Sequence, residues 1–78
     1  MHLTLRQLQC FSAVARNRSF TRAAEELHLT QPAVSMQVRQ LEQQAGLPLT
    51  EQFGKQLHLT EAGEEVYRYA RSILGEVE

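Results

Sequence analysis

Residues 30–42 read TQPAVSMQVRQLE, and this stretch decides how the rest of the chain is interpreted. Thr30 suits the N-cap of a helix, because its hydroxyl can accept a hydrogen bond from a backbone N–H of the next turn. Pro32 follows in the first turn, where its missing N–H costs nothing. Gly46 and then Pro48 stop a helix at the other end. The sequence therefore predicts a helix between Thr30 and Gly46.

The two faces of this predicted helix differ in chemistry. At about 100° per residue its apolar residues gather on one side: Val34, Val38, Leu41 and Ala45. The opposite side carries Pro32, Met36, Arg39 and Gln43, flanked by Ser35 and Gln40, with Gln31 at the exposed N-terminal end. A helix in a DNA major groove needs adjustable donors and acceptors for base edges, and apolar atoms for thymine methyls. The wheel alone equally supports a solvated face of polar filler.

Two shorter helices are predicted before this one. Apolar residues recur at spacings of three and four over residues 4–16, with Thr4 as a possible N-cap. The residues Asn17-Arg18-Ser19 interrupt that stripe, and a second helix is predicted to run from about Ser19 or Thr21 to Leu27. Two short helices joined by a tight turn, the second with an apolar inner face, outline a helix-turn-helix.

The segment after Pro48 changes character. Residues 49–60 contain a Gly54-centred turn and then alternation at Leu57 and Leu59, which predicts two short strands in a hairpin. Thr60 and the acids after it open a fourth helix.

Apolar residues in the fourth predicted helix fall at spacings of four, three and four, as in a coiled-coil seam: Val66, Ala70, Ile73 and Val77. No cap interrupts this pattern, so we expect the helix to continue beyond residue 78 in a longer chain.

Charge is unevenly distributed along the 78 residues, which are enough for one small domain. Residues 1–60 carry six Lys or Arg against four Glu, a net +2, whereas residues 61–78 carry two Arg against five Glu, a net −3. The total of −1 therefore hides a mildly basic body and an acidic tail. The basic body and the predicted hairpin favour the DNA-binding interpretation of the third helix over the solvated-face interpretation.

Enzymatic and metal-binding functions have no support in the sequence. The three histidines, at positions 2, 28 and 58, lack metal-ligand spacing, and no serine has the context of an activated nucleophile. Cys10 is alone, so no intrachain disulfide forms. No stretch has the length of a membrane span or the form of a signal peptide. We expect no metal, no cofactor, no enzymatic activity, no membrane partner and a cytoplasmic location.

The segments LRQLQCFSAVARNRSFTRAAEELHLTQPAVSMQVRQLEQQAGLPL (5–49) and LTEAGEEVYRYAR (59–71) resemble the N-terminal domain of LysR-type transcriptional regulators. Within that family, MHLTLRQLQ and TQPAVSMQVRQLE are most similar to regulators of carbon-dioxide-fixation operons. The resemblance implies a mainly α fold. Residues 1–60 form a winged helix-turn-helix, with a three-helix core and a short β-hairpin wing, and residues 61–78 form a truncated linker helix for dimerisation.

The resemblance also assigns roles to individual residues. Base contacts fall to Gln31, Pro32, Ser35 and Met36, and phosphate contacts to Thr30, Arg22 and Arg39. Lys55 in the wing reaches the minor groove. The dimer interface on the linker helix comprises Val66, Tyr69, Ala70, Ile73, Leu74 and Val77.

Three positions depart from the family pattern. Many members carry Arg where this chain has Met36, and Gln52 also stands where members place Arg. Thr50 replaces a large aromatic residue, a change that would loosen the wing or leave a small cavity beneath it.

The implied partners are double-stranded DNA and a second copy of the chain. A tetramer in the full-length parent is possible, and a small-molecule effector would bind only in a C-terminal domain absent from these residues. The alternative is a helical dimerisation module with little or no specific DNA binding. The acidic tail, the net charge, Met36 and Gln52 favour that alternative.

Overall fold

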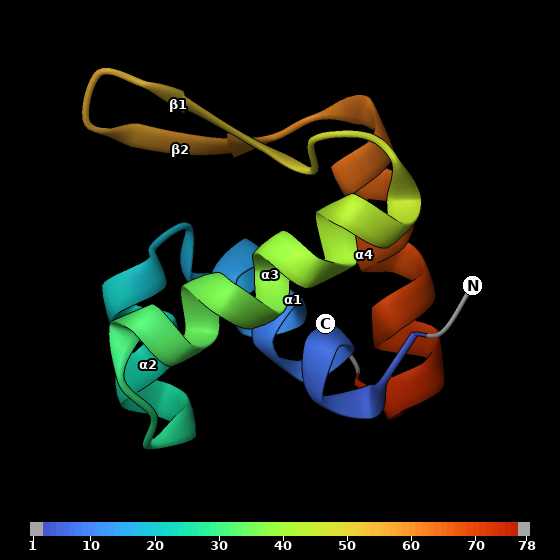
Figure 1. Cartoon of the computed structure of the whole chain (residues 1–78), viewed down its shortest axis with the longest axis horizontal. Helices are drawn as coiled ribbons and strands as arrows, with labels where there is room; N and C mark the ends of the chain where they lie inside the picture. The colour runs from blue at the N-terminus through green and yellow to red at the C-terminus, as the bar shows by residue number, and fades with distance from the viewer. Residues whose placement is uncertain (1–2, 77–78) are drawn as a thin grey trace.

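The computed structural model describes residues 3–76 and contains four helices and one hairpin within them (Figure 1). In chain order the elements are α1 (Leu5–Asn17), α2 (Phe20–Leu27), α3 (Gln31–Ala45), β1 (Thr50–Phe53), β2 (Gln56–Leu59) and α4 (Glu61–Leu74). The helices and the hairpin begin where the sequence predicts them, and the chain is mainly α-helical.

A hydroxyl side chain caps the N-terminus of every helix in the described part of the chain. In α1 the cap is a full capping box: Gln7 N donates to Thr4 Oγ1 at 3.0 Å, and Thr4 N donates to Gln7 Oε1 at 3.2 Å. Ser19, Thr30 and Thr60 accept in the same way from the backbone N–H three residues on. Local sequence therefore sets where each helix begins.

The core forms around α1, which packs against α2, α3 and α4. Phe11 and Val14 of α1 are fully buried, and the apolar face of α3 closes on them. Leu49, Leu57 and Ala70 bring the hairpin and α4 into the same core.

The turn between α2 and α3 forms without a glycine. His28 adopts a left-handed conformation with φ of 57°, and its backbone N–H donates to carbonyl oxygens at the end of α2. Arg18 adopts the same conformation (φ 54°) between α1 and α2. Such residues are less favourable than glycine in this region, and the capping hydrogen bonds from their backbone N–H groups hold both turns.

The hairpin is a regular antiparallel pair, with Thr50 opposite Leu59 and Phe53 opposite Gln56. Thr50 takes its place in this register, so the smaller side chain does not interrupt strand pairing. Directly opposed residues share a face: one face carries Glu51, Phe53, Gln56 and His58, all exposed. The other face carries Leu57, which is buried beneath the hairpin.

The end of α4 differs from the expectation of an uncapped helix. The helix stops at Leu74 because Gly75 adopts φ of 70° and donates its N–H to the preceding turn. Glu76 then folds back, and Ser12 Oγ of α1 donates a 2.6 Å hydrogen bond to its carboxylate. Val77, assigned to the dimer interface, lies outside the described residues.

Candidate nucleic-acid interface

Helix α3 presents the two faces that its sequence predicts. Val34, Val38 and Leu41 are at most 2% exposed, so one side is committed to the core. The opposite side is open: Gln31, Pro32, Met36 and Arg39 are exposed, and Ser35 is half-buried beside them. The four predicted base-contacting residues therefore lie together on the outer surface of the N-terminal half of α3.

The N-terminal end of α3 combines a cap with an ordered side-chain pair. Thr30 Oγ1 accepts a 3.2 Å hydrogen bond from Ala33 N, which uses the hydroxyl as an acceptor but leaves its proton free to donate. Gln31 Nε2 donates to Ser35 Oγ at 3.0 Å. The positive end of the helix dipole adds a favourable field for an anion at this terminus.

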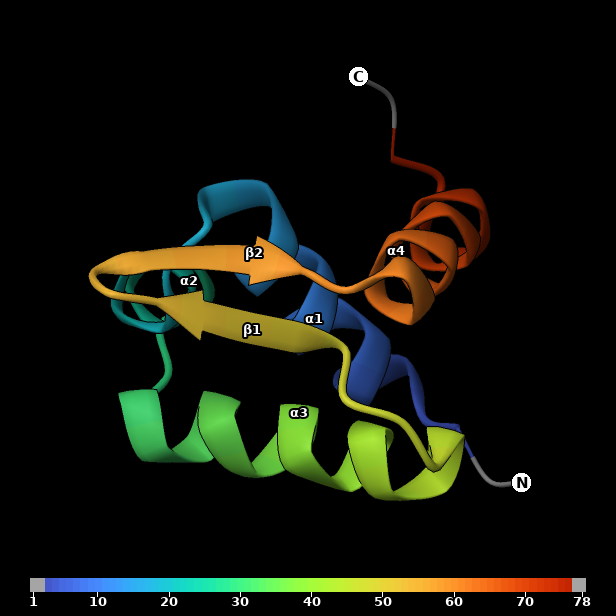
Figure 2. The same cartoon turned by 90° about the horizontal axis from the view of Figure 1, so that it is seen from above.

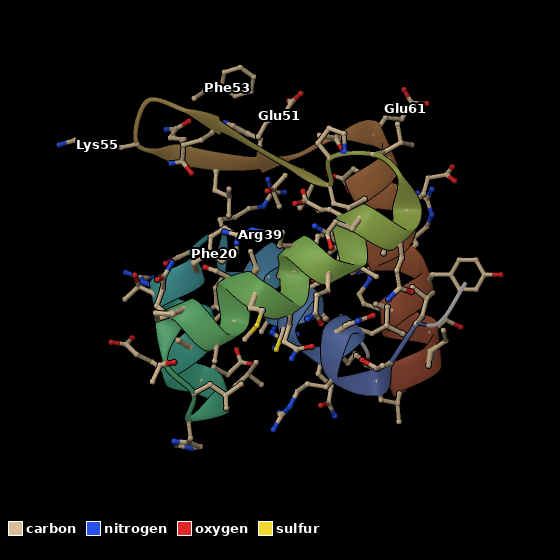
Figure 3. All side chains as sticks on the ribbon, viewed as in Figure 1. Phe20, Arg39, Glu51, Phe53, Lys55 and Glu61 are labelled. Carbon is tan, nitrogen blue, oxygen red and sulfur yellow. The ribbon has the colours of Figure 1, made fainter. Side chains whose placement is uncertain are left out.

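The predicted phosphate contacts come from two further positions. Arg22 is exposed in the first turn of α2, where its backbone N–H is fixed by Ser19 at 3.0 Å. Arg39 lies between α3 and the hairpin, whereas Phe53 and Glu51 point from the hairpin away from α3 (Figure 3). The acidic Glu51 thus stands on the far face of the hairpin from the cation of α3.

The hairpin places Lys55 at its exposed tip. In both views the tip lies on the same side of the molecule as the N-terminal end of α3 (Figure 2). One continuous double helix can therefore meet the helix end and the hairpin tip together.

Arg18 lies in the segment between α1 and α2, far along the chain from the hairpin. The structure brings it beside the hairpin, where a shallow pocket is lined by Arg18, Lys55, Gln56, Leu57 and His58. Arg18 and Lys55 are 37 residues apart in the chain, so their sequence spacing could not predict that they lie close together.

Arg16, by contrast, is committed to contacts within the chain. Its guanidinium pairs with Glu26 of α2 and lies 3.3 Å from the carboxylate of Glu76. Asn17 Nδ2 also donates to Glu26 at 2.9 Å. This hydrogen bond from Asn17, opposed by partial burial and assisted by Arg16, lowers the pKa of Glu26 below its ordinary value. Arg16 is therefore a structural cation.

Cys10 and the His and Glu side chains of residues 3–76 are the remaining candidates for reactive or metal-binding chemistry. The Cys10 thiol is buried in the core, and burial raises its pKa, opposed by the charge of Arg6. Within the described residues, no three His, Cys, Asp or Glu side chains gather as metal ligands would. None of the helices there has the length and apolarity needed to cross a membrane.

The predicted dimer-interface residues of α4 separate into two groups. Ala70 has no exposed surface because α1 covers it, and Val66 and Leu74 are half-buried against the core. The assignment of Ala70 to a contact between chains is therefore corrected: this residue packs inside its own chain. Tyr69 and Ile73 are 72% and 51% exposed and remain open to a partner.

A helix-turn-helix whose second helix exposes a polar face, followed by a two-stranded hairpin on the same side, defines the winged helix-turn-helix class of nucleic-acid-binding domains. The model of the "Bacterial regulatory helix-turn-helix protein, lysR family" matches residues 5–64. The chain belongs to this LysR family.

The curated relatives are transcriptional regulators. The chain is 68% identical over 73 residues to a "RuBisCO operon transcriptional regulator" of Allochromatium vinosum, covering 94% of this chain and 24% of the relative. It is 64% identical over 75 residues to the "HTH-type transcriptional regulator CfxR" of Cupriavidus necator, covering 96% of this chain and 24% of that protein. The chain thus spans about a quarter of the length of these relatives. These relatives are named as transcriptional regulators, not as enzymes.

Solved structures agree in fold and in class. The BenM DNA-binding domain in complex with "catB site 1 DNA" has a TM-score of 0.88 and 38% sequence identity, over 92% of this chain and 81% of that one. The CbnR DNA-binding domain in a complex with DNA has a TM-score of 0.86 and 38% identity, over 92% of this chain and 83% of that one. The winged helix-turn-helix fold predicted from the sequence is confirmed.

Proposed function

We propose that this chain is the sequence-specific DNA-binding part of a transcriptional regulator that controls carbon-fixation genes. One observation carries the proposal: the N-terminal end of α3, where Gln31 and Met36 are exposed, and the cationic hairpin tip lie on one side of the molecule. The DNA complexes of BenM and CbnR, which share the fold, and the RuBisCO-operon relatives support it.

In this proposal α3 enters the major groove. Gln31 and Ser35 bind base edges, while Pro32 and Met36 contact thymine methyls or exclude water beside them. Thr30, Arg22 and Arg39 hold phosphates and set the register, and Lys55 reaches the adjacent minor groove. Because Met36 is uncharged, this position discriminates through apolar contact instead of a bidentate guanine contact.

The functional unit is a homodimer formed through α4. The exposed pair Tyr69 and Ile73 lies one turn apart on this helix, and two such pairs supply the apolar centre that an interface needs. Two recognition helices would then meet successive major grooves about 34 Å apart on a partly palindromic site. In this proposal the parent regulator acts in the cytoplasm, can assemble further into a tetramer, and senses its effector outside these 78 residues.

A binding selection tests the proposal directly. The protein is titrated by fluorescence anisotropy against a pool of randomised duplexes at two salt concentrations, and the bound fraction is sequenced. We expect salt-dependent binding that enriches a two-fold symmetric site, because phosphate contacts release counterions and base contacts select sequence. Salt-dependent binding without enrichment would reject base contacts by α3. No binding at either salt would favour the alternative, a helical dimerisation module.

A further inference from the structure

Two of the side chains assigned to base contact bind each other in the free protein. Gln31 Nε2 donates a 3.0 Å hydrogen bond to Ser35 Oγ, one turn further along the outer face of α3. Gln31 is exposed and Ser35 is half-buried at the base of the contact. We propose that Ser35 is a positioning residue that orients the Gln31 amide for a single adenine edge. This inference rests on the proposed function, because it requires α3 to enter the major groove.

The hydrogen-bonding groups that the Gln31–Ser35 pair leaves free match the major-groove edge of one base, adenine. A glutamine side chain offers one carbonyl oxygen and two N–H groups. Ser35 accepts one N–H of the Gln31 amide. The proposal requires this to be the N–H trans to the carbonyl, since Oε1 and the other N–H then stand side by side for a base. Adenine presents the matching pair in the major groove, a donor at N6 and an acceptor at N7. Other base edges there lack this adjacent donor and acceptor.

Fixing the amide matters because a free glutamine is highly mobile. Its long side chain loses much rotamer freedom on binding. Rotation of its amide also exchanges the positions of the acceptor oxygen and the donor nitrogen that face the base. A hydroxyl that holds the nitrogen removes part of this freedom before DNA arrives, which is how preorganisation strengthens a contact. Ser35 is half-buried and its side chain has a single heavy-atom torsion, so its hydroxyl is less mobile than the Gln31 amide.

The test removes single acceptors from the DNA. Each adenine of the selected site is replaced in turn by 7-deazaadenine, which keeps base pairing and the N6 amino group but lacks N7. With the unmodified protein we expect one adenine per half-site at which this change weakens binding about three- to tenfold, the effect of one hydrogen bond. Gln31→Ala should abolish that sensitivity and thereby identify the position.

Ser35→Ala and Ser35→Thr then separate positioning from direct contact. We expect Ser35→Ala to reduce the 7-deaza effect at the Gln31 position to less than twofold, and Ser35→Thr to retain it because the hydroxyl remains. Alanine favours the helix, so the Ser35→Ala variant should remain folded. Circular dichroism confirms folding.

Two results would overturn the positioning role. A full 7-deaza effect at the Gln31 position in Ser35→Ala would show that Gln31 orients itself. Loss of sensitivity only at a different base in that variant would leave Ser35 as a base contact without a positioning role. Absence of any selected site in the unmodified protein would instead defeat the proposed function, and the positioning role with it.

Discussion

Gly63 of α4 lies directly against the backbone of Leu49: a Cβ atom at position 63 would stand 2.0 Å from Leu49 O and 2.9 Å from its carbonyl carbon. Both obstructing atoms belong to the main chain, so they cannot move aside as a side chain would. Leu49 N is itself held by Glu42 Oε2 at 2.7 Å. The start of α4 and the start of the hairpin are thus locked to each other through a glycine.

We expect Gly63→Ala to lower the free energy of unfolding by about 3 kcal/mol or more, the upper end of the range for overpacking. This loss should exceed that of Gly54→Ala, because only position 63 has atoms close to the added Cβ. Urea denaturation measures the free energy of unfolding. Gly54→Ala is the matched control: nothing lies within 4 Å of its new Cβ, and its φ of 61° leaves only the conformational cost, about 1–2 kcal/mol. Equal losses in the two variants would contradict the close contact at Gly63.

Thr60 links the same two elements through its hydroxyl. Thr60 Oγ1 accepts from Gly63 N at 2.9 Å and donates to Pro48 O at 2.7 Å. We expect Thr60→Ala to lower stability by about 1–2 kcal/mol, because an N-cap and a second hydrogen bond are lost together. Thr60→Ser keeps both bonds and should lie near the unmodified protein in thermal and urea melts. A serine variant as weak as the alanine variant would reject the hydroxyl as the cause.

Glu26 makes the free energy of unfolding depend on pH in the acid range. Its pKa is lowered in the folded chain, chiefly by the hydrogen bond from Asn17, so around and below the ordinary pKa of glutamate the unfolded chain binds more protons. The stabilisation is therefore fully present above the ordinary pKa of glutamate, about 4.3, and is lost as pH falls through the folded pKa. We expect Glu26→Gln to have a flatter free energy of unfolding across this acid range in urea melts. Asn17→Ala should flatten it in the same direction, and unchanged pH slopes in both variants would contradict this contribution.

Lys55 should contribute affinity without specificity. We expect Lys55→Ala to weaken selected and random duplexes by the same factor and to reduce the slope of log affinity against log salt by about one unit per contact removed. Gln31→Ala is the contrasting variant, since it should weaken the selected duplex more than the random one and leave the salt slope unchanged. Anisotropy titrations at several salt concentrations measure both quantities. A selective loss of the preferred site in Lys55→Ala would instead make this residue a base contact.

Dimerisation should depend on the exposed face of α4. We expect Ile73→Glu to convert a dimer to a monomer in sedimentation equilibrium and to weaken binding to the two-fold site far more than to a half-site. Arg68→Gln changes the charge by the same one unit at an exposed position elsewhere on α4 and should remain dimeric. Unaltered self-association in Ile73→Glu would reject this face as the interface.

The hairpin's position shows why some of the site could not be read along the chain. Arg18 and Lys55 share a pocket although 37 residues separate them, and Arg16, two residues before Arg18, is instead bound to Glu26 and Glu76. Neighbouring arginines with the same local pattern therefore take different roles. Only the tertiary structure distinguishes them, because charge pairing depends on distance in space.

The sequence by itself determined the elements and the recognition face. Thr4, Ser19, Thr30 and Thr60 cap their helices through contacts three residues away, and the 3.6-residue period separates buried Val34 and Val38 from exposed Met36 and Gln31. Such interactions are local, so the order of residues suffices to predict them. The same period placed Ala70 in an exposed seam, although α1 buries it completely. Periodicity identifies an apolar face, but only tertiary structure decides whether the chain's own core or a second chain covers it, since both remove the same surface from water.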